Sequence, residues 1–175
     1  MYKNKAIFFD RDGVINKLVA RDNGFFSPRT FNEFDFYEDV SSCISSLVKK
    51  GFLIFIVSNQ PDISRKKMLI KELKKIDIAI NKKLNIDQIY YSFDSKVVAG
   101  GSKKPSPKMI FDARDQWNID LSESYFLGDS LVDIECAKNA NISFILVKRE
   151  HNQEIEYTPY INTLNDFDKM LNNTI

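Results

Sequence analysis

Cysteine and histidine are scarce in this chain of 175 residues. Its two cysteines, Cys43 and Cys136, lie far apart, and His151 is the only histidine. Two distant cysteines form neither a disulfide framework nor a metal-ligand pair, so we expect both to be small, buried apolar side chains in a reducing compartment. One histidine does not assemble Ser-His-Asp or Cys-His chemistry, and we interpret His151 as an ordinary surface or loop residue.

A strong charge imbalance and long apolar runs are also missing. The formal net charge is +1, which gives no reason to expect nucleic acid or an anionic membrane as a partner. The apolar run that starts at Ala6 stops at Asp10, which is too short for a signal peptide or a membrane span. We therefore expect a cytoplasmic protein that binds neither nucleic acid nor membranes.

The chain does contain short apolar runs that are separated by amphipathic segments. The runs are typical of strands buried on both faces, and they cover residues 6–9, 52–57, 88–93, 125–127 and 143–147. Helical patterns cover residues 40–48, 68–84, 107–117 and 131–140, with a short one at 165–171. This alternation predicts an α/β fold with a doubly wound, parallel, five-stranded sheet. No linker divides the chain, so we predict a single domain over residues 1–175.

Residues 16–36 form a long segment without a clear pattern. It is rich in aromatic residues and contains Gly24 and Pro28. Long loops in compact domains are often functional, so we predict a loop that contributes to a binding site. Hydrophobic packing over the edge of the sheet is the alternative.

Acidic pairs follow two of the predicted strands. Asp10 and Asp12 come directly after the first strand, and Asp129 and Asp133 follow the fourth. Open α/β sheets bind ligands at the carboxyl ends of their strands, where these residues would meet. Paired carboxylates repel each other unless a cation or a proton lies between them. Loop solvation or helix capping explains each pair alone, although capping accounts for one carboxylate more easily than for two.

Polar and basic residues follow the second strand and precede the third helix. Ser58 and Asn59 end the strand, and a hydroxyl and an amide beside the start of a helix suit a phosphate group. An ordinary helix cap is the alternative. Lys103 and Lys104 precede Pro105, which restricts the backbone so that Lys104 can be aimed at a ligand. An exposed basic loop would look the same in isolation.

The four clusters in this order resemble the haloacid dehalogenase superfamily of phosphohydrolases, over about residues 5–147. Residues 9–16, 58–65 and 103–109 are similar to motifs of the branch that contains D-glycero-D-manno-heptose 1,7-bisphosphate phosphatases and histidinol-phosphatases. The resemblance implies a Rossmann-like core with strand order 3-2-1-4-5 and no cap domain. It also favours a monomer, and no coiled-coil pattern contradicts this.

The resemblance implies a phosphatase that acts on a small phosphate ester through a covalent intermediate. Asp10 would attack phosphorus and take the phosphoryl group. Asp12 would protonate the leaving alcohol and then deprotonate the attacking water. Ser58, the backbone of Asn59 and the catalytic Lys104 would bind the phosphoryl oxygens.

The resemblance also implies Mg²⁺ as the cofactor. Its ligands would be the Asp10 carboxylate, the backbone carbonyl of Asp12 and the Asp129 carboxylate. Asp133 would bind the ion through water or orient Asp129. Residues 92–102 lack the cysteines and histidine of the branch's zinc loop, so we expect no structural zinc.

The substrate is the least specific part of this interpretation. We predict a sugar phosphate or bisphosphate used for a surface polysaccharide, with Arg65 and Lys103 holding a second anionic group and residues 18–35 forming part of the wall. Lys103 stands where the branch usually has arginine, and Pro61-Asp62 replaces its Ser-Gly pair. These two departures and the missing zinc loop put the heptose bisphosphate itself in doubt.

Other interpretations remain open at this point. Histidinol phosphate or an amino-alcohol phosphate is an alternative substrate. A phospho-accepting receiver domain would share the α/β alternation and would place an acid such as Asp94 after its third strand, but the other acidic motifs fit that scheme poorly. A dehalogenase would not use Asp12 in this way, and a phosphomutase would normally need a cap.

Overall fold

Six parallel strands form the central sheet of the computed structural model, which describes residues 3–22 and 24–173. Their order is β5-β4-β1-β6-β7-β8. The strands are β1 (Ala6–Phe9), β4 (Leu53–Asn59), β5 (Gln88–Ser92), β6 (Tyr125–Gly128), β7 (Ser143–Val147) and β8 (Tyr160–Ile161). The predicted fold class and the order of the five predicted strands are confirmed. The prediction of five strands missed β8, because a strand of two residues is too short to produce an apolar pattern.

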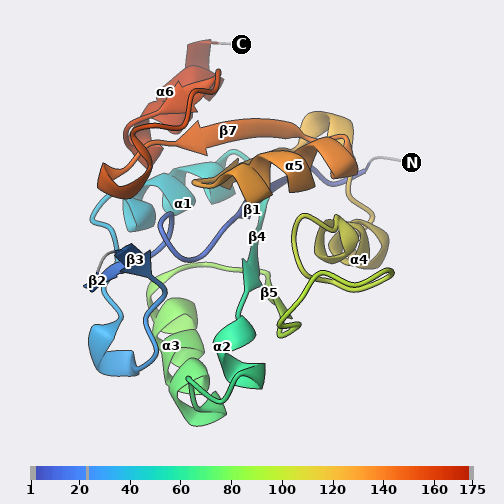
Figure 1. The fold of residues 1–175 in the computed structure, drawn as a ribbon. Coiled ribbons are helices and arrows are strands. Elements are labelled where there is room, and N and C mark those ends of the chain that lie inside the picture. The colour runs from blue at the N-terminus through green and yellow to red at the C-terminus, as the bar shows by residue number, and fades with distance from the viewer. Residues whose placement is uncertain (1–2, 23, 174–175) are drawn as a thin grey trace.

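Helices cover both faces of the sheet (Figure 1). One face packs against α1 (Val40–Lys49), α3 (Ile70–Lys83) and α6 (Leu164–Asn173). The other face packs against α4 (Lys108–Trp117) and α5 (Leu131–Ala140). Successive side chains of a strand point to opposite faces, so Ile7 and Phe9 belong to the first core and Phe8 to the second. These helices agree with the predicted ones to within a few residues.

The predicted loop over residues 16–36 contains a short hairpin outside the main sheet. Its antiparallel strands are β2 (Val19–Arg21) and β3 (Gly24–Phe26). Arg21 pairs with Glu33 at 2.6 Å, which ties the hairpin to the 3-10 helix η1 (Phe31–Glu33). Strands of three residues carry too few alternating positions to be recognised in the sequence.

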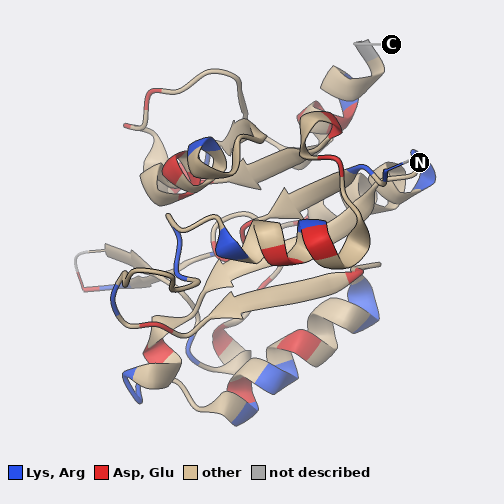
Figure 2. Ribbon diagram, turned by 90° about the vertical axis from the view of Figure 1, so that its right-hand side faces the viewer, with Lys and Arg blue, Asp and Glu red and all other residues tan. Residues whose placement is uncertain are grey.

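Charged side chains lie mainly on helices and loops, whereas the strands are largely free of them (Figure 2). The continuous apolar runs of the sequence are therefore the buried strands. Cys43 and Cys136 are both free and buried, as predicted. Within residues 3–22 and 24–173, no helix has the length and apolar character needed to cross a bilayer. The single domain over residues 1–175 stays a prediction.

Candidate active site

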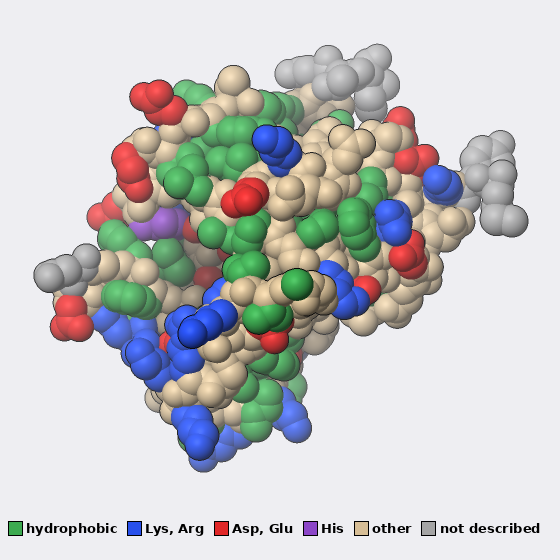
Figure 3. Space-filling model, turned by 45° about the vertical axis from the view of Figure 1, so that its right-hand side comes forward, with side chains coloured by type: hydrophobic (Ala, Val, Ile, Leu, Met, Phe, Trp, Pro, Cys, Tyr) green, Lys and Arg blue, Asp and Glu red, His purple; other side chains and the backbone are tan. Residues whose placement is uncertain are grey.

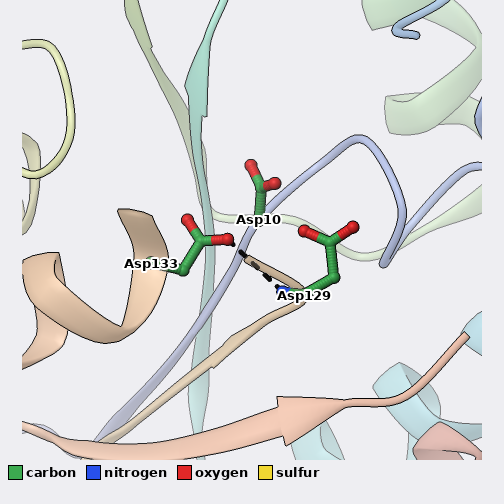
Figure 4. Close-up of side chains that lie close together, drawn as sticks. All are labelled: Asp10, Asp129 and Asp133. Carbon is green, nitrogen blue, oxygen red and sulfur yellow. Dashed lines mark hydrogen bonds between the residues drawn. The ribbon is translucent and has the colours of Figure 1, made fainter. Parts of the chain in front are cut away.

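Three buried carboxylates meet at the carboxyl ends of two neighbouring strands. Asp10 follows β1, Asp129 follows β6, and Asp133 lies in the first turn of α5. One oxygen from each lies within 4.8 Å of the others, and the three side chains surround one point (Figure 4). Asp129 and Asp133 do not share a helical face, because Asp129 precedes Ser130, the N-cap residue of α5. Asp129 lies beside Asp133 because β6 ends directly before it.

Lys104 is the cation beside this group. Its Nζ donates to Asp10 Oδ1 at 2.8 Å and to Asp133 Oδ1 at 2.6 Å, and the side chain is buried. Burial opposes the charged lysine, but the carboxylates of Asp10 and Asp133 raise its pKa above the ordinary value. One lysine does not balance three carboxylates. The site therefore favours a further cation, and an all-oxygen donor set suits Mg²⁺.

Asp133 has a structural role as well. Its Oδ2 accepts hydrogen bonds from the backbone N–H and the hydroxyl of Ser130, at 3.2 and 2.6 Å, in a capping box that starts α5. The second oxygen accepts from Lys104. Asp133 therefore does act as a helix-capping residue, which was the alternative that the sequence left open. The capping contacts of Oδ2 direct the other oxygen into the site.

His151 was interpreted as an ordinary surface or loop residue, and this is wrong. Its Nε2 lies 2.5 Å from Asp129 Oδ2, and its ring is 5.9 Å from that of Phe25. The next residue, Asn152, donates to the backbone carbonyl of Asp129 at 2.7 Å. Gly13, with a φ of +93°, leaves room for this arrangement, since a Cβ there would lie 1.8 Å from Asp129 Oδ2. In the sequence, the only sign of a role for His151 was that it follows the fifth predicted strand.

The last two residues of β4, Ser58 and Asn59, make hydrogen bonds beside the site. The side chain of Asn59 accepts from the backbone N–H of Lys104 at 2.9 Å and donates to its carbonyl at 3.2 Å. Asn59 therefore fixes the backbone that carries the lysine, a role that the sequence did not reveal. Ser58 is buried and accepts from Gln60 Nε2 at 3.0 Å. Phosphate binding by Ser58 and by the Asn59 backbone stays a prediction.

Arg65 and Lys103 lie together, but neither lines the cavity that Asp10 and Lys104 border, and their binding of a second anion stays a prediction. Arg65 Nη2 and Lys103 Nζ both donate to the carbonyl of Ser95, at 3.2 and 2.9 Å. Burial and the charge of Arg65 lower the pKa of Lys103. The negative charge of Asp62 is matched by Arg29 at 2.8 Å and by Arg65 at 3.5 Å. The two arginines thereby offset the negative charge of Asp62 near the phosphate-binding loop.

Hydrogen bonds close the segment where the branch has its zinc loop. Asp94 Oδ2 accepts from the Ser92 hydroxyl at 3.3 Å and from the Ser102 backbone N–H at 3.3 Å. The loop that leads to Lys103 and Lys104 is thus tied back to the end of β5. The absence of structural zinc stays a prediction.

These groups border a cavity of about 450 Å³. The central groups Asp10, Asp129, Asp133 and Lys104 line it together with Asp12 and Asn59. The other lining residues are Leu18, Phe25, Phe26, Ser27, Ser130, Val132, His151, Asn152, Glu154 and Ile155. On this face the histidine lies beside apolar side chains, with lysine and arginine side chains below them (Figure 3). Phe25 and Phe26 confirm that the segment predicted as the wall reaches the cavity.

Known proteins resemble this chain along most of its length. The model of the haloacid dehalogenase-like hydrolase family matches residues 25–147. The D-glycero-D-manno-heptose-1,7-bisphosphate 7-phosphatase of Chlorobaculum tepidum is 30% identical over 174 residues, covering 88% of this chain and 83% of that protein. The chain belongs to the haloacid dehalogenase-like hydrolases. The predicted superfamily and enzyme class, a phosphoric monoester hydrolase, are confirmed.

Other members of the family agree with this assignment. The D-glycero-beta-D-manno-heptose-1,7-bisphosphate 7-phosphatase of Escherichia coli K12 is 32% identical over 149 residues, covering 78% of this chain and 75% of that protein. The crystal structure of D,D-heptose 1.7-bisphosphate phosphatase from B. bronchiseptica, complexed with magnesium and phosphate, aligns with a TM-score of 0.82. At 22% identity, with 98% of this chain and 99% of that chain covered, this likeness concerns the fold.

Proposed function

We propose that this haloacid dehalogenase-like hydrolase is a Mg²⁺-dependent phosphatase that transfers the phosphoryl group of a small ester to Asp10 and then to water. The observation that carries the proposal is the buried group of Asp10, Asp129 and Asp133, joined by Lys104. Burial raises the pKa of Asp10 well above its ordinary range, the carboxylates of Asp133 and Asp129 add to this, and only Lys104 opposes it. A further cation beside this group would favour the ionised nucleophile.

The first step divides a slow hydrolysis into two easier reactions. An oxygen of the Asp10 carboxylate attacks phosphorus, a phosphorus–oxygen bond forms, and the bond to the ester oxygen breaks. Asp12 acts as the general acid and gives a proton to that oxygen, which leaves as an alcohol. Lys104 Nζ, which is already within hydrogen-bond distance of Asp10, neutralises charge on the transferring group.

The second step releases the enzyme. Asp12, now a carboxylate, takes a proton from a water molecule whose oxygen attacks phosphorus. The bond between phosphorus and Asp10 breaks, inorganic phosphate leaves, and both aspartates return to their starting states. Asp12 lines the same cavity as Asp10.

The carboxylates of Asp10 and Asp129 and the backbone carbonyl of Asp12 would hold Mg²⁺, with Asp133 behind them. When bound, the ion reduces repulsion between the carboxylate nucleophile and the anionic ester. His151 and Asn152 hold Asp129 from its outer side, through its Oδ2 and its backbone carbonyl.

The substrate we propose is a sugar phosphate that carries a second anionic group. Two relatives, each of which aligns with this chain over more than two thirds of its own length, are named heptose bisphosphate phosphatases. Arg65 and Lys103 present two neighbouring cations next to the loop that supplies Lys104. Their shared contact with the Ser95 carbonyl is a position that a substrate phosphate or carboxylate would take over.

Replacing the nucleophile tests the mechanism. We expect Asp10→Asn to abolish Mg²⁺-dependent phosphate release and the acid-stable phosphoprotein that the wild type forms from a ³²P-labelled substrate. Asp112→Asn, at an exposed position on α4, is the matched control and should behave as the wild type. Near-normal turnover by Asp10→Asn would refute the covalent mechanism.

Replacing the two outer cations tests the substrate. We expect Arg65→Ala and Lys103→Ala each to raise KM for a sugar bisphosphate about tenfold, which is the loss of roughly 1.4 kcal/mol of charge-assisted hydrogen bonding. KM for the matching monophosphate should change little, and Lys108→Ala on α4 serves as the control. Equal effects on both substrates would remove the second-anion hypothesis.

A further inference from the structure

The carboxylate of Asp12 is held by hydrogen bonds from three directions. Arg11 Nε and Nη2 donate to Oδ1 at 3.0 and 2.9 Å, and Nη2 also donates to Oδ2 at 3.0 Å. Asn16 Nδ2 donates to Oδ1 at 3.0 Å, and Gln60 Nε2 donates to Oδ2 at 2.6 Å. Both carboxylate oxygens are therefore engaged, and the plane of the group is set.

The donors stand behind Asp12 rather than in the cavity. Asp12 lines the cavity, but Arg11, Asn16 and Gln60 are not among its lining residues, and all three are buried. They are thus placed to orient Asp12 without touching a ligand in the cavity.

Arg11 has an unusual environment for an arginine. Its side chain is fully buried, and its ion-pair partner is Asp12. Its Nη1 has no hydrogen-bond partner among the described residues. A buried charge is costly unless it is paired, and a hydrophobic residue of similar size would fill the same space at lower cost. The fork of Arg11 instead fixes the plane of the Asp12 carboxylate.

Gln60 connects Asp12 to a second strand. It follows β4, its backbone N–H donates to the Ser92 carbonyl at 2.7 Å, and its Nε2 also contacts the Ser58 hydroxyl at 3.0 Å. The end of β4 is anchored to β5 in this way, so Gln60 approaches Asp12 from a rigid part of the sheet. Groups fixed to regular elements hold a catalytic side chain more accurately than mobile loops do.

We propose that Arg11 and Gln60 are positioning residues that aim Asp12 at the ester oxygen and at the attacking water. The inference rests on the proposed function, in which Asp12 transfers both protons. It adds that this transfer depends on a clamp made of a buried guanidinium and a buried amide.

The two half-reactions give the clamp a distinct signature. p-Nitrophenolate leaves without needing a proton, whereas the alkoxide of a sugar phosphate needs one. A loosened Asp12 should therefore spare the first step with p-nitrophenyl phosphate but slow the second step, in which Asp12 acts as a base. The phosphorylated Asp10 would then accumulate, and a burst of p-nitrophenolate would precede slow turnover.

The test uses the full chain with Mg²⁺ and the near-isosteric variant Gln60→Met. We expect kcat for the best sugar phosphate substrate to fall about tenfold or more. General acid–base catalysis contributes about 10²- to 10⁴-fold to the rate, and a misoriented Asp12 would lose part of that contribution. With p-nitrophenyl phosphate, rapid mixing should show a burst close to one equivalent of enzyme, and acid quenching should trap more phosphoprotein than in the wild type. Arg11→Lys is a second variant. It keeps the positive charge but loses the planar guanidinium that donates from two nitrogens, and we expect the same signature from it.

The matched control is Gln116→Met on α4, where the exposed glutamine contacts Tyr90 and Gln88. It should leave both kinetics and phosphoprotein unchanged. Unaltered kinetics in Gln60→Met and Arg11→Lys, or an equal loss on both substrates without a burst, would overturn the clamp. Turnover without trapped phosphoprotein in the wild type and in both variants would instead overturn the proposed function and the clamp with it.

Discussion

At the residue scale, Asp129 shows how a single side chain is held for a ligand. Burial raises its pKa above the ordinary value, Asp133 adds to this, and the hydrogen bond with His151 opposes it. Its Oδ2 is enclosed by His151 and Gly13, while its backbone carbonyl accepts from Asn152. The carboxylate therefore has little freedom to turn away from Asp10 and Asp133.

We expect His151→Ala to weaken Mg²⁺ binding by about 10- to 100-fold, the usual effect of removing a group that hydrogen-bonds a metal-ligating side chain. The reason is that Asp129 would then lose the contact that sets its orientation. Isothermal titration calorimetry of the phosphate-free protein measures the affinity directly and does not depend on turnover.

His151→Gln retains an N–H donor and should recover part of that affinity. An exposed polar residue such as Gln116, replaced by alanine, provides the background value. Unchanged or tighter Mg²⁺ binding in His151→Ala would show that the histidine does not support the metal site.

At the element scale, α6 closes the first core of the sheet. Phe167 is 1% exposed and its ring meets that of Tyr125 edge-on at 5.4 Å. Asp168 forms an ion pair with Lys50 of α1, and the backbone N–H of Leu164 donates to Asp39 Oδ2 at 2.7 Å. The helix therefore belongs to the hydrophobic core that packs against β1 and β6.

We expect Phe167→Ala to lower the free energy of unfolding by about 3–5 kcal/mol, because a large buried ring is replaced by a cavity. Urea denaturation followed by circular dichroism gives the value. Phe31→Ala is the control, since Phe31 is 40% exposed and should cost far less. Equal losses in the two variants would mean that α6 contributes no packing to the core.

At the scale of the whole molecule, the buried acids make stability depend on pH and on the metal. The pKa values of Asp10 and Asp129 are raised from an ordinary value of 3.8, chiefly by burial. Above pH 3.8 the unfolded chain releases these protons while the folded chain still holds them. Stability from the two groups is therefore complete below 3.8 and is lost as pH rises through their folded pKa values.

We expect Asp10→Asn to be more stable than the wild type in EDTA at neutral pH, because it removes one charge from the crowded group. The difference in melting temperature should grow as the pH rises from about 4 to neutral. Mg²⁺ should stabilise the wild type more than the variant. Thermal unfolding over that range, with Asp112→Asn as the control, measures both effects. A pH-independent difference would contradict the raised pKa of Asp10.

Much of the architecture was accessible from the amino-acid sequence. Strands buried on both faces appear as continuous apolar runs, such as Ala6–Phe9 and Ser143–Val147, which the structure reproduces. The acids that follow β1 and β6 could be placed at one edge, because parallel strands bring their carboxyl ends together. Short elements such as β8 and the β2–β3 hairpin could not, since two or three residues carry no periodic signal.

The sequence by itself determined the alternation of strands and helices and which reactive groups reach the carboxyl edge of the sheet. Only the tertiary structure decided how they are oriented. His151 meets Asp129 across 22 positions of the chain, and Gln60 meets Asp12 across 48. Such contacts depend on how separate strands and loops pack, and periodicity within one element carries no information about the side chain that a distant element presents to it.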